Sequence, residues 1–154
     1  MKKTILLGTL LFTLFSHYSF AGRKVKEIDE RVKASFNREF VNAEEVQWVD
    51  MKSYIKVNFK VVNQALSAYF NPDGELLAVT RNISSNQLPI GLLLTLKTKY
   101  AGYWITDLLE MNDRESSIYF ATVTNGDREI LLKSQQGNSW QVYRKKRRLP
   151  LSSN

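Results

Sequence analysis

Hydrophobic and polar residues recur with two different periods along this chain, and the changes of period divide it into helices and strands. In one early stretch the hydrophobic residues return every three or four positions, at Val25, Ile28, Val32, Phe36 and Phe40. This spacing places them on one side of a helix, and Asn42 is its predicted end. From Tyr54 to Val62 hydrophobic and polar residues alternate one by one, which predicts a strand with one buried face.

Further strands are predicted on both sides of this one. Residues 45–50 also alternate, and residues 51–53 separate them from the central strand as a turn. Residues 65–82 are typical of strand, tight turn and strand, with the turn at Asn71-Pro72-Asp73-Gly74. Pro72 suits the second position of a type I turn and Gly74 the fourth. The first half of the chain is therefore expected to be a helix followed by four strands.

The second half shows the same order. Pro89 suits the first turn of a second helix, whose apolar stripe is formed by Leu93, Leu96 and Tyr100. Four strands are expected after it, at residues 103–111, 115–124, 128–134 and 139 to about 144, and Asn125-Gly126 is a strong hairpin signal.

Matching positions in the two halves lie 60 to 63 residues apart: Phe40 and Tyr100, Met51 and Asn112, Asn63 and Asn125, and Gly74 and Gly137. The spacing predicts a tandem duplication, with repeat one at about residues 24–83 and repeat two at about residues 88–143. Short hairpins join only antiparallel strands, and a helix with one apolar stripe must cover a sheet face. The predicted fold class is α+β: an antiparallel sheet of about eight strands with two helices packed on one face.

Residues 1–21 differ in kind from the rest. Two lysines precede an apolar run from Thr4 to Phe15, and small residues lead up to Ala21. This is the pattern of a secretory signal peptide cleaved between Ala21 and Gly22. The apolar run is shorter than the roughly 20 residues that cross a bilayer, and no Cys follows it, which argues against a lipoprotein. The protein is expected to be periplasmic or secreted and not membrane-spanning after cleavage.

Composition restricts the chemistry. The chain has no Cys, and its one histidine, His17, lies in the predicted signal peptide. Nucleophilic triads, histidine acid–base catalysis and the usual zinc and copper ligand sets are thereby excluded from the mature chain. Ser53 and Lys56 match a Ser-x-x-Lys spacing, but on a turn and a strand their side chains face opposite ways. We therefore expect no enzymatic activity, no cofactor and no metal.

Acidic residues gather near one predicted turn, at Asp107, Glu110, Asp113 and Glu115. They could hold a hard cation, but they lack the spacing of a calcium-binding EF-hand loop. A solvated loop is the favoured interpretation.

Positive charge is concentrated near the C-terminus. The formal charge of the chain is +7, of which Lys2 and Lys3 leave with the signal peptide and Arg144, Lys145, Lys146, Arg147 and Arg148 supply five, so the remaining body is neutral (7 − 2 − 5 = 0). Residues 144–154 are predicted to be a basic tail, which either binds anionic lipid, polysaccharide or an acidic partner or only keeps the last strand soluble. Aromatic residues do not alternate with these cations, so nucleic acid is not an expected partner.

Tyrosines are the other candidate for binding. If Ile55, Val57 and Phe59 face the helices, alternation places four tyrosines on the opposite face: Tyr54, Tyr69, Tyr119 and Tyr143. Exposed tyrosines suit partner binding, although cross-strand pairing on a wet sheet face would also explain them.

Motifs across the chain resemble the PepSY-like, β-lactamase-inhibitor-like (BLIP-like) family of small exported proteins from Gram-negative bacteria. They span about residues 24–143 and comprise Phe36, Phe40, Asn42, Ala43, Val46, Trp48, Tyr54, Val57, Phe59, Ala68, Tyr69, Phe70, Asp73, Gly74, Leu76, Leu88, Pro89 and Tyr100. The second half departs from the first, because Gln136-Gly137 replaces Asp73-Gly74. The resemblance implies a tandem helix-plus-four-strand fold with one curved sheet. Relatives in name inhibit β-lactamases or peptidases by binding, but no inhibitory contact residue of theirs has a matching motif here.

Together these observations predict a domain at residues 22–143 that acts as a non-enzymatic periplasmic protein-binding module. It would be an inhibitor or chaperone-like factor for an envelope or secreted protein, with the sheet face as its surface. The alternative is an envelope-associated protein that binds anionic lipid or polysaccharide through residues 144–148.

Overall fold

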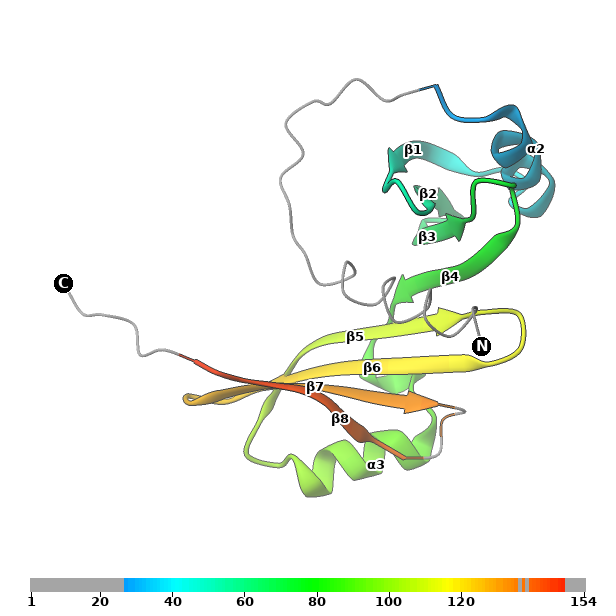
Figure 1. Ribbon diagram of the computed structural model, residues 1–154. Coiled ribbons are helices and arrows are strands. Elements are labelled where there is room, and N and C mark those ends of the chain that lie inside the picture. The colour runs from blue at the N-terminus through cyan, green and yellow to red at the C-terminus, as the bar shows by residue number, and fades with distance from the viewer. Residues whose placement is uncertain (1–26, 136, 138, 149–154) are drawn as a thin grey trace.

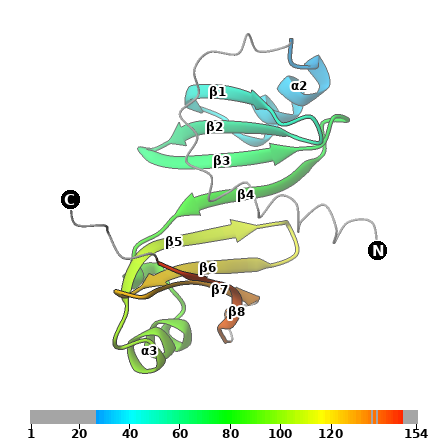
Figure 2. The same cartoon turned by 60° about the vertical axis from the view of Figure 1, so that its left-hand side comes forward.

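One continuous antiparallel sheet of eight strands forms the centre of the molecule, and its strands follow one another in chain order from β1 to β8 (Figures 1 and 2). The computed structural model describes residues 27–135, 137 and 139–148 of the 154. Within these described residues, two α-helices and a short 3₁₀ helix, η1, accompany the sheet. This confirms the predicted α+β class with an antiparallel sheet of about eight strands and two helices. Within the described ranges, no helix is long and apolar enough to cross a membrane.

The elements follow in the order α2 (Glu30–Glu39), β1 (Glu44–Asp50), β2 (Ile55–Val61), β3 (Gln64–Phe70), β4 (Leu76–Asn82), η1 (Ser85–Gln87), α3 (Ile90–Lys99), β5 (Trp104–Asn112), β6 (Ser117–Thr124), β7 (Arg128–Gln135) and β8 (Gln141–Arg147). Each half thus has a helix followed by four strands. Descent of the two halves from one duplicated unit stays a prediction. The predicted signal peptide and its cleavage site at Ala21 and Gly22 lie outside the described residues.

Helix α2 covers the sheet face of the first half. Its N-terminus is capped by Asp29, whose side chain accepts a hydrogen bond from the backbone N–H of Arg31 at 2.9 Å. Val32 and Phe36 are buried against Val57 and Phe59 of β2, as the period of hydrophobic residues predicts. Burial of each such side chain contributes about 1.5–3 kcal/mol.

Helix α3 covers the same face in the second half. Its buried residues are Leu92 and Leu96, while Leu93 and Tyr100 are only partly buried. The buried side of α3 is therefore rotated by about one residue from the predicted stripe of Leu93, Leu96 and Tyr100. The pairing of β4 with β5 shows that the two helices cover the same face. Val79 of β4 packs beneath α2, and Arg81, two residues further along β4, lies on the same side. Arg81 pairs with Glu110, which accepts a hydrogen bond from Tyr119 beneath α3. Figure 2 shows α2 beside the first strands and α3 beside the last.

A glycine in the last hairpin turn of each half packs on the start of that half's helix. In the turn after β3, Gly74 has a φ of +87°, and its N–H donates to the Asn71 carbonyl, as in a type I turn. A Cβ at Gly74 would lie 2.9 Å from the Arg31 carbonyl oxygen of α2. Gly137, with φ of +69°, likewise lies against Pro89 before α3. These glycines allow the hairpins to contact their helices.

Two other hairpin turns differ from what the sequence predicts, the first because the central strand ends at Val61 and not at Val62. The two-residue turn between β2 and β3 is formed by Val62 and Asn63, both at positive φ, where a β-branched residue is strained. The Asn125-Gly126 hairpin is present, but Gly126 does not adopt positive φ. Instead the Asn125 side chain accepts hydrogen bonds from the N–H groups of Asp127 and Arg128 and closes the turn.

The predicted boundary between the last strand and a basic tail at residue 144 is wrong. Strand β8 continues to Arg147, and Arg144, Lys145, Lys146 and Arg147 pair with β7. Arg148 also donates its backbone N–H to the Asp127 carbonyl at 2.8 Å. The pairing extends this far because β7 begins at Arg128, so its backbone groups are available to β8 whatever the side-chain charge.

Replacing Gly74 by Ala should lower the free energy of unfolding by about 2–3 kcal/mol, because the new Cβ needs both an unfavourable φ and the space of the Arg31 carbonyl. Gly91 of α3 is the matched control. Nothing lies within 4 Å of a Cβ added there, so Gly91→Ala should stabilise by up to about 1 kcal/mol. Urea denaturation of both variants measures the difference. Equal stability of the two variants would contradict the close contact between hairpin and helix.

Candidate binding face of the sheet

The sheet face opposite α2 and α3, called here the second face, carries the candidate site. Residues that pair directly across strands share a face, and one such row crosses most of the sheet: Gln47, Asn58, Ser67, Thr80, Met111 and Ile118. The row is polar over β1 to β4 and apolar over β5 and β6. The second face therefore changes in character from one half of the molecule to the other.

Its apolar part is a buried cluster to which neither α2 nor α3 contributes a residue. The members are Tyr54, Tyr69, Ala78, Leu109, Met111, Ile118, Phe120 and Leu131, with Met51 and Leu77 partly buried against them. Curvature of the sheet lets strands from both halves meet here, because Tyr69 of β3 and Leu131 of β7 belong to one cluster. The two halves of the chain thus share this core.

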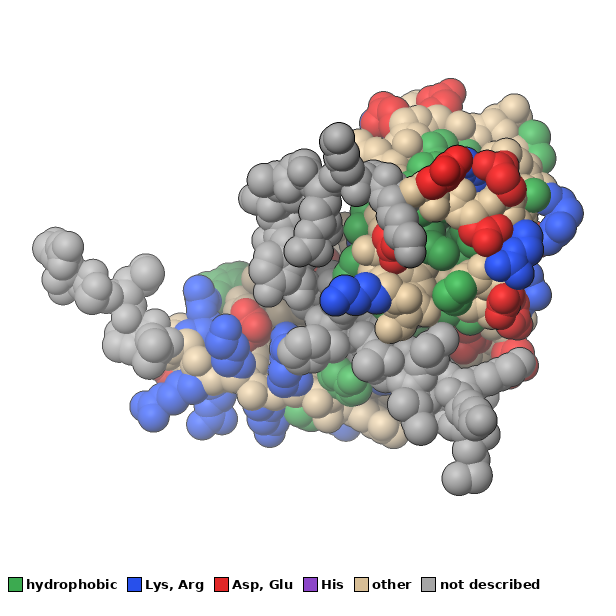
Figure 3. Space-filling model, turned by 45° about the horizontal axis from the view of Figure 1, so that its top comes forward, with side chains coloured by type: hydrophobic (Ala, Val, Ile, Leu, Met, Phe, Trp, Pro, Cys, Tyr) green, Lys and Arg blue, Asp and Glu red, His purple; other side chains and the backbone are tan. Residues whose placement is uncertain are grey.

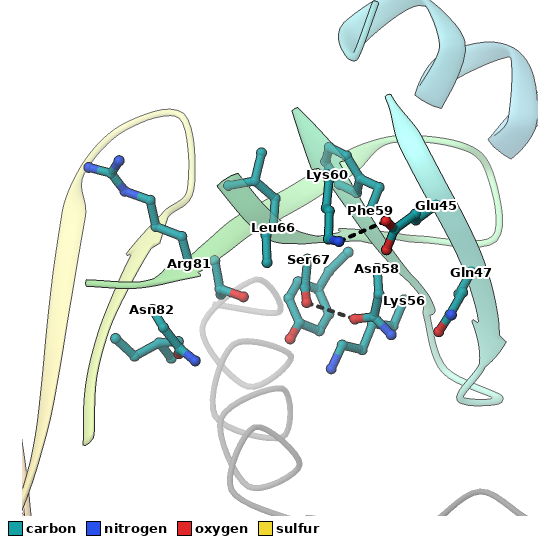
Figure 4. Close-up of a pocket in the computed structure, with 14 residues that line it drawn as sticks. Glu45, Gln47, Lys56, Asn58, Phe59, Lys60, Leu66, Ser67, Arg81 and Asn82 are labelled. Carbon is teal, nitrogen blue, oxygen red and sulfur yellow. Dashed lines mark hydrogen bonds and ion pairs between the residues drawn. The ribbon is translucent and has the colours of Figure 1, made fainter. Parts of the chain in front are cut away.

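Beside this cluster, a cavity of about 320 Å³ lies over β1 to β4. Figure 4 shows the side chains of Lys56, Asn58, Lys60 and Ser67 from β2 and β3 in this region. The Ser67 hydroxyl donates to the Asn58 amide oxygen at 2.8 Å, and Lys60 forms an ion pair with Glu45 at 2.7 Å. Arg81 also contributes to the lining, but its guanidinium points away from these groups in Figure 4.

Lys56 and Tyr69 lie side by side in the cavity wall. They pair across β2 and β3, and the Lys56 ammonium lies 5.8 Å from the centre of the Tyr69 ring, within cation–π distance. Burial lowers the pKa of Lys56 and raises the pKa of Tyr69 to about 12, with the nearby Thr80 and Ser67 hydroxyls opposing the second shift. Among the described residues, the Tyr69 hydroxyl is buried and has no partner within hydrogen-bond geometry.

The structure corrects the prediction of four exposed tyrosines. Tyr54 and Tyr69 lie on the second face as alternation predicts, but both are buried in its cluster, with ring centres 5.8 Å apart. Tyr143 is 47% exposed. It lies at the edge of the same face, with its ring centre 6.5 Å from the ring centre of Phe120.

The alternation argument that placed four tyrosines on the second face is wrong for Tyr119. It packs with Leu88 and Leu92 on the α3 side, and Phe120 lies on the second face instead. Tyr119 and Phe120 are both buried, so hydrophobicity could not distinguish their directions.

Tyr119 belongs to a partly buried polar network that joins the two halves. Its hydroxyl donates to Glu110 at 3.1 Å, and the second oxygen of Glu110 accepts from Arg81 of β4 at 2.6 Å. Burial raises the pKa of Tyr119, and the hydrogen bond to Glu110 and the charge of Glu110 raise it further. The prediction that the acidic residues lie in a solvated loop is therefore wrong for Glu110, which is buried in β5. No group of three acidic residues in the described part of the chain is arranged for a metal ion.

The basic residues predicted to bind anions form the edge strand. All side chains of β8 are exposed, as is Arg148, and Figure 3 shows Lys and Arg side chains gathered at this end of the molecule. Glu129 faces Lys146 across the strands. Charged side chains on an edge strand also prevent other strands from pairing with it.

Sequence reasoning missed Lys56, Asn58 and Ser67 as site residues. The alternation in β2 already indicated that Lys56 and Asn58 face away from α2. It could not show that Ser67 and Tyr69 of β3 lie directly opposite them, because that depends on the register set by the Val62-Asn63 turn.

Solved structures of Bacteroides proteins share this fold. A BLIP-like protein from Bacteroides fragilis matches with a TM-score of 0.69 at 16% identity, over 80% of this chain and 89% of that chain. A DUF2874 family protein from Bacteroides uniformis matches at 0.68 and 14% identity, over 77% and 88% of the two chains. A protein from Bacteroides eggerthii, provisionally described as periplasmic, matches at 0.68 and 13% identity, over 79% and 90%.

These identities establish the fold alone: the chain has a BLIP-like fold. No family model matches the sequence, and no curated protein matches it. The PepSY-like part of the resemblance stays a prediction.

Tyr69 should make stability fall at alkaline pH. Its folded pKa of about 12 lies above the ordinary value of 10.0, so its contribution is fully present below pH 10 and is lost as the pH rises through 12. Two pKa units correspond to about 3 kcal/mol. In urea denaturation between pH 9 and 12, wild type should lose about 2 kcal/mol more than Tyr69→Phe, because half of the folded molecules still carry the Tyr69 proton at pH 12. Parallel pH profiles of the two proteins would show that the Tyr69 hydroxyl is not buried.

Proposed function

We propose that this protein is a non-enzymatic module that binds another protein of the cell envelope through the second face. The observation that supports this most is the cluster of aromatic and aliphatic residues on a sheet face to which neither α2 nor α3 contributes. The cluster itself is buried, so a partner would contact the residues around it, and an apolar centre with a polar rim is typical of protein interfaces. The BLIP-like fold points in the same direction, and an inhibitor or a chaperone-like factor would each be a form of this function.

The rim of the second face offers accessible contacts around the buried cluster. Gln47 of β1 and Tyr143 of β8 are exposed, and Met51, Leu77 and Lys133 are partly exposed. A partner that spans the face would contact both edge strands, because Gln47 and Tyr143 belong to its opposite ends. Export to the periplasm or beyond is part of this proposal, since binding to an envelope protein requires it.

Site-directed photo-cross-linking in cells tests the proposal. A photoreactive phenylalanine at Gln47 or at Tyr143 should give the same discrete protein adduct, identified by mass spectrometry. Leu94 and Ile90 of α3 are matched controls, because both are exposed hydrophobic residues on the helix side, and they should give no such adduct. Adducts from the α3 positions alone, or none from any position, would contradict binding through the second face.

A second candidate function is binding of an anionic envelope surface through β8. It is favoured by five consecutive exposed cations, Arg144 to Arg148, at an edge of the sheet. Their attraction to anionic lipid would be electrostatic and would weaken with salt.

Vesicle co-sedimentation tests whether the cations of β8 bind anionic lipid or only prevent other strands from pairing with this edge. Truncation after Tyr143 is unsuitable because it would remove half of β8. Replacing Lys145, Lys146 and Arg147 together by Gln keeps the strand, and should abolish sedimentation with phosphatidylglycerol vesicles. Replacing Lys97 and Lys99 of α3 by Gln is the control and should leave it intact. Equal sedimentation with phosphatidylcholine vesicles would contradict an electrostatic mechanism.

A further inference from the structure

Among the described residues that line the cavity over β1 to β4, one cation has no ion-pair partner. Four of these lining residues are charged: Glu45, Lys56, Lys60 and Arg81. Lys60 is paired with Glu45, and Arg81 with Glu110. Among the described residues, no carboxylate lies within ion-pair distance of Lys56. After these pairs are counted, the lining carries a single positive charge.

The groups around Lys56 are hydrogen-bond donors. The Tyr69 residue is only 1% exposed, lines the cavity and has a hydroxyl without a partner among the described residues. The Asn58 amide oxygen is occupied by Ser67, so the Asn58 N–H₂ group can donate to a ligand. A buried donor without an acceptor costs about 1–3 kcal/mol, which a suitable ligand would recover.

We propose that this cavity binds the carboxylate of an acidic side chain of the protein partner, with Lys56 supplying the charge and Tyr69 and Asn58 the hydrogen bonds. A carboxylate is a pure acceptor with one negative charge, which matches one unpaired cation among donors. A phosphate dianion would leave one charge uncompensated in a partly buried site. A volume of about 320 Å³ accommodates an Asp or Glu side chain. This inference rests on the proposed function, because the acid is assigned to the partner.

The first test uses N-acetyl-L-glutamate N-methylamide and its glutamine counterpart as probes. The probes are titrated into the full gene product, purified with its N-terminus established by mass spectrometry, and followed by NMR. The glutamate compound should shift the signals of Lys56, Asn58, Ser67 and Tyr69 and raise the pKa of the Lys56 ammonium. The glutamine compound should do neither. Equal response to both compounds, or tighter binding of inorganic phosphate at Lys56, overturns the proposal.

Variants distinguish binding from a structural role. Lys56→Met should weaken glutamate binding at least tenfold, while Lys97→Met, the same change on α3, should leave it unchanged. Tyr69→Phe removes only the unpartnered hydroxyl, so it should weaken binding several-fold without loss of stability at pH 7. Unchanged binding in Lys56→Met, or loss of stability equal to loss of binding in Tyr69→Phe, overturns the proposal.

The two proposals can fail separately. If the adducts from Gln47 and Tyr143 form but no carboxylate binds at Lys56, the acidic partner residue is excluded and the binding face stands. If the glutamate compound binds but no adduct forms, the cavity is a carboxylate site and the assignment of its ligand to a protein partner is wrong.

Discussion

Pairing of all eight strands into one sheet is the constraint on which the other features depend. Because side chains alternate between the faces of a strand, the pairing of the strands, with register shifts in four of the seven pairs, decides which residues of β1 to β8 lie under the helices and which lie on the second face. The two helices cover one face only, since Val79 and the Arg81–Glu110 pair lie on the same side. Among the described residues, the apolar cluster of the second face is formed by strand and turn residues, and aromatic and aliphatic side chains from both halves meet there.

The same register gives the second face its two chemical parts. In the first half, β2 and β3 place Lys56, Asn58 and Ser67 side by side with Tyr69, and these residues form the wall of a polar cavity. In the second half, β5 to β7 place Leu109, Phe120 and Leu131 in the apolar cluster. An apolar area beside Lys56, which has no ion-pair partner among the described residues, is a combination suited to a protein partner with a matching acidic residue.

Much of this architecture could be predicted without the structure. The two helices, the strands of β2 and β3 and the hairpin at Asn71 to Gly74 follow from local periodicity and turn chemistry, because those signals act between near neighbours in the chain. The faces of β6 could not be assigned this way. Ile118 to Ala121 are all buried, so no polar residue marked a wet side, and Tyr119 was placed on the wrong face.

For this protein, the sequence alone determined the types and order of the elements, the absence of Cys and the concentration of positive charge near the C-terminus. It also determined which side of β2 faces α2, since Ile55, Val57 and Phe59 alternate with polar residues. Tertiary structure decided that the basic run is an edge strand, that Tyr54 and Tyr69 are buried, and that Lys56 has no carboxylate partner among the described residues. These properties depend on which strands lie side by side, and pairing between distant segments is not encoded in the pattern of any one of them.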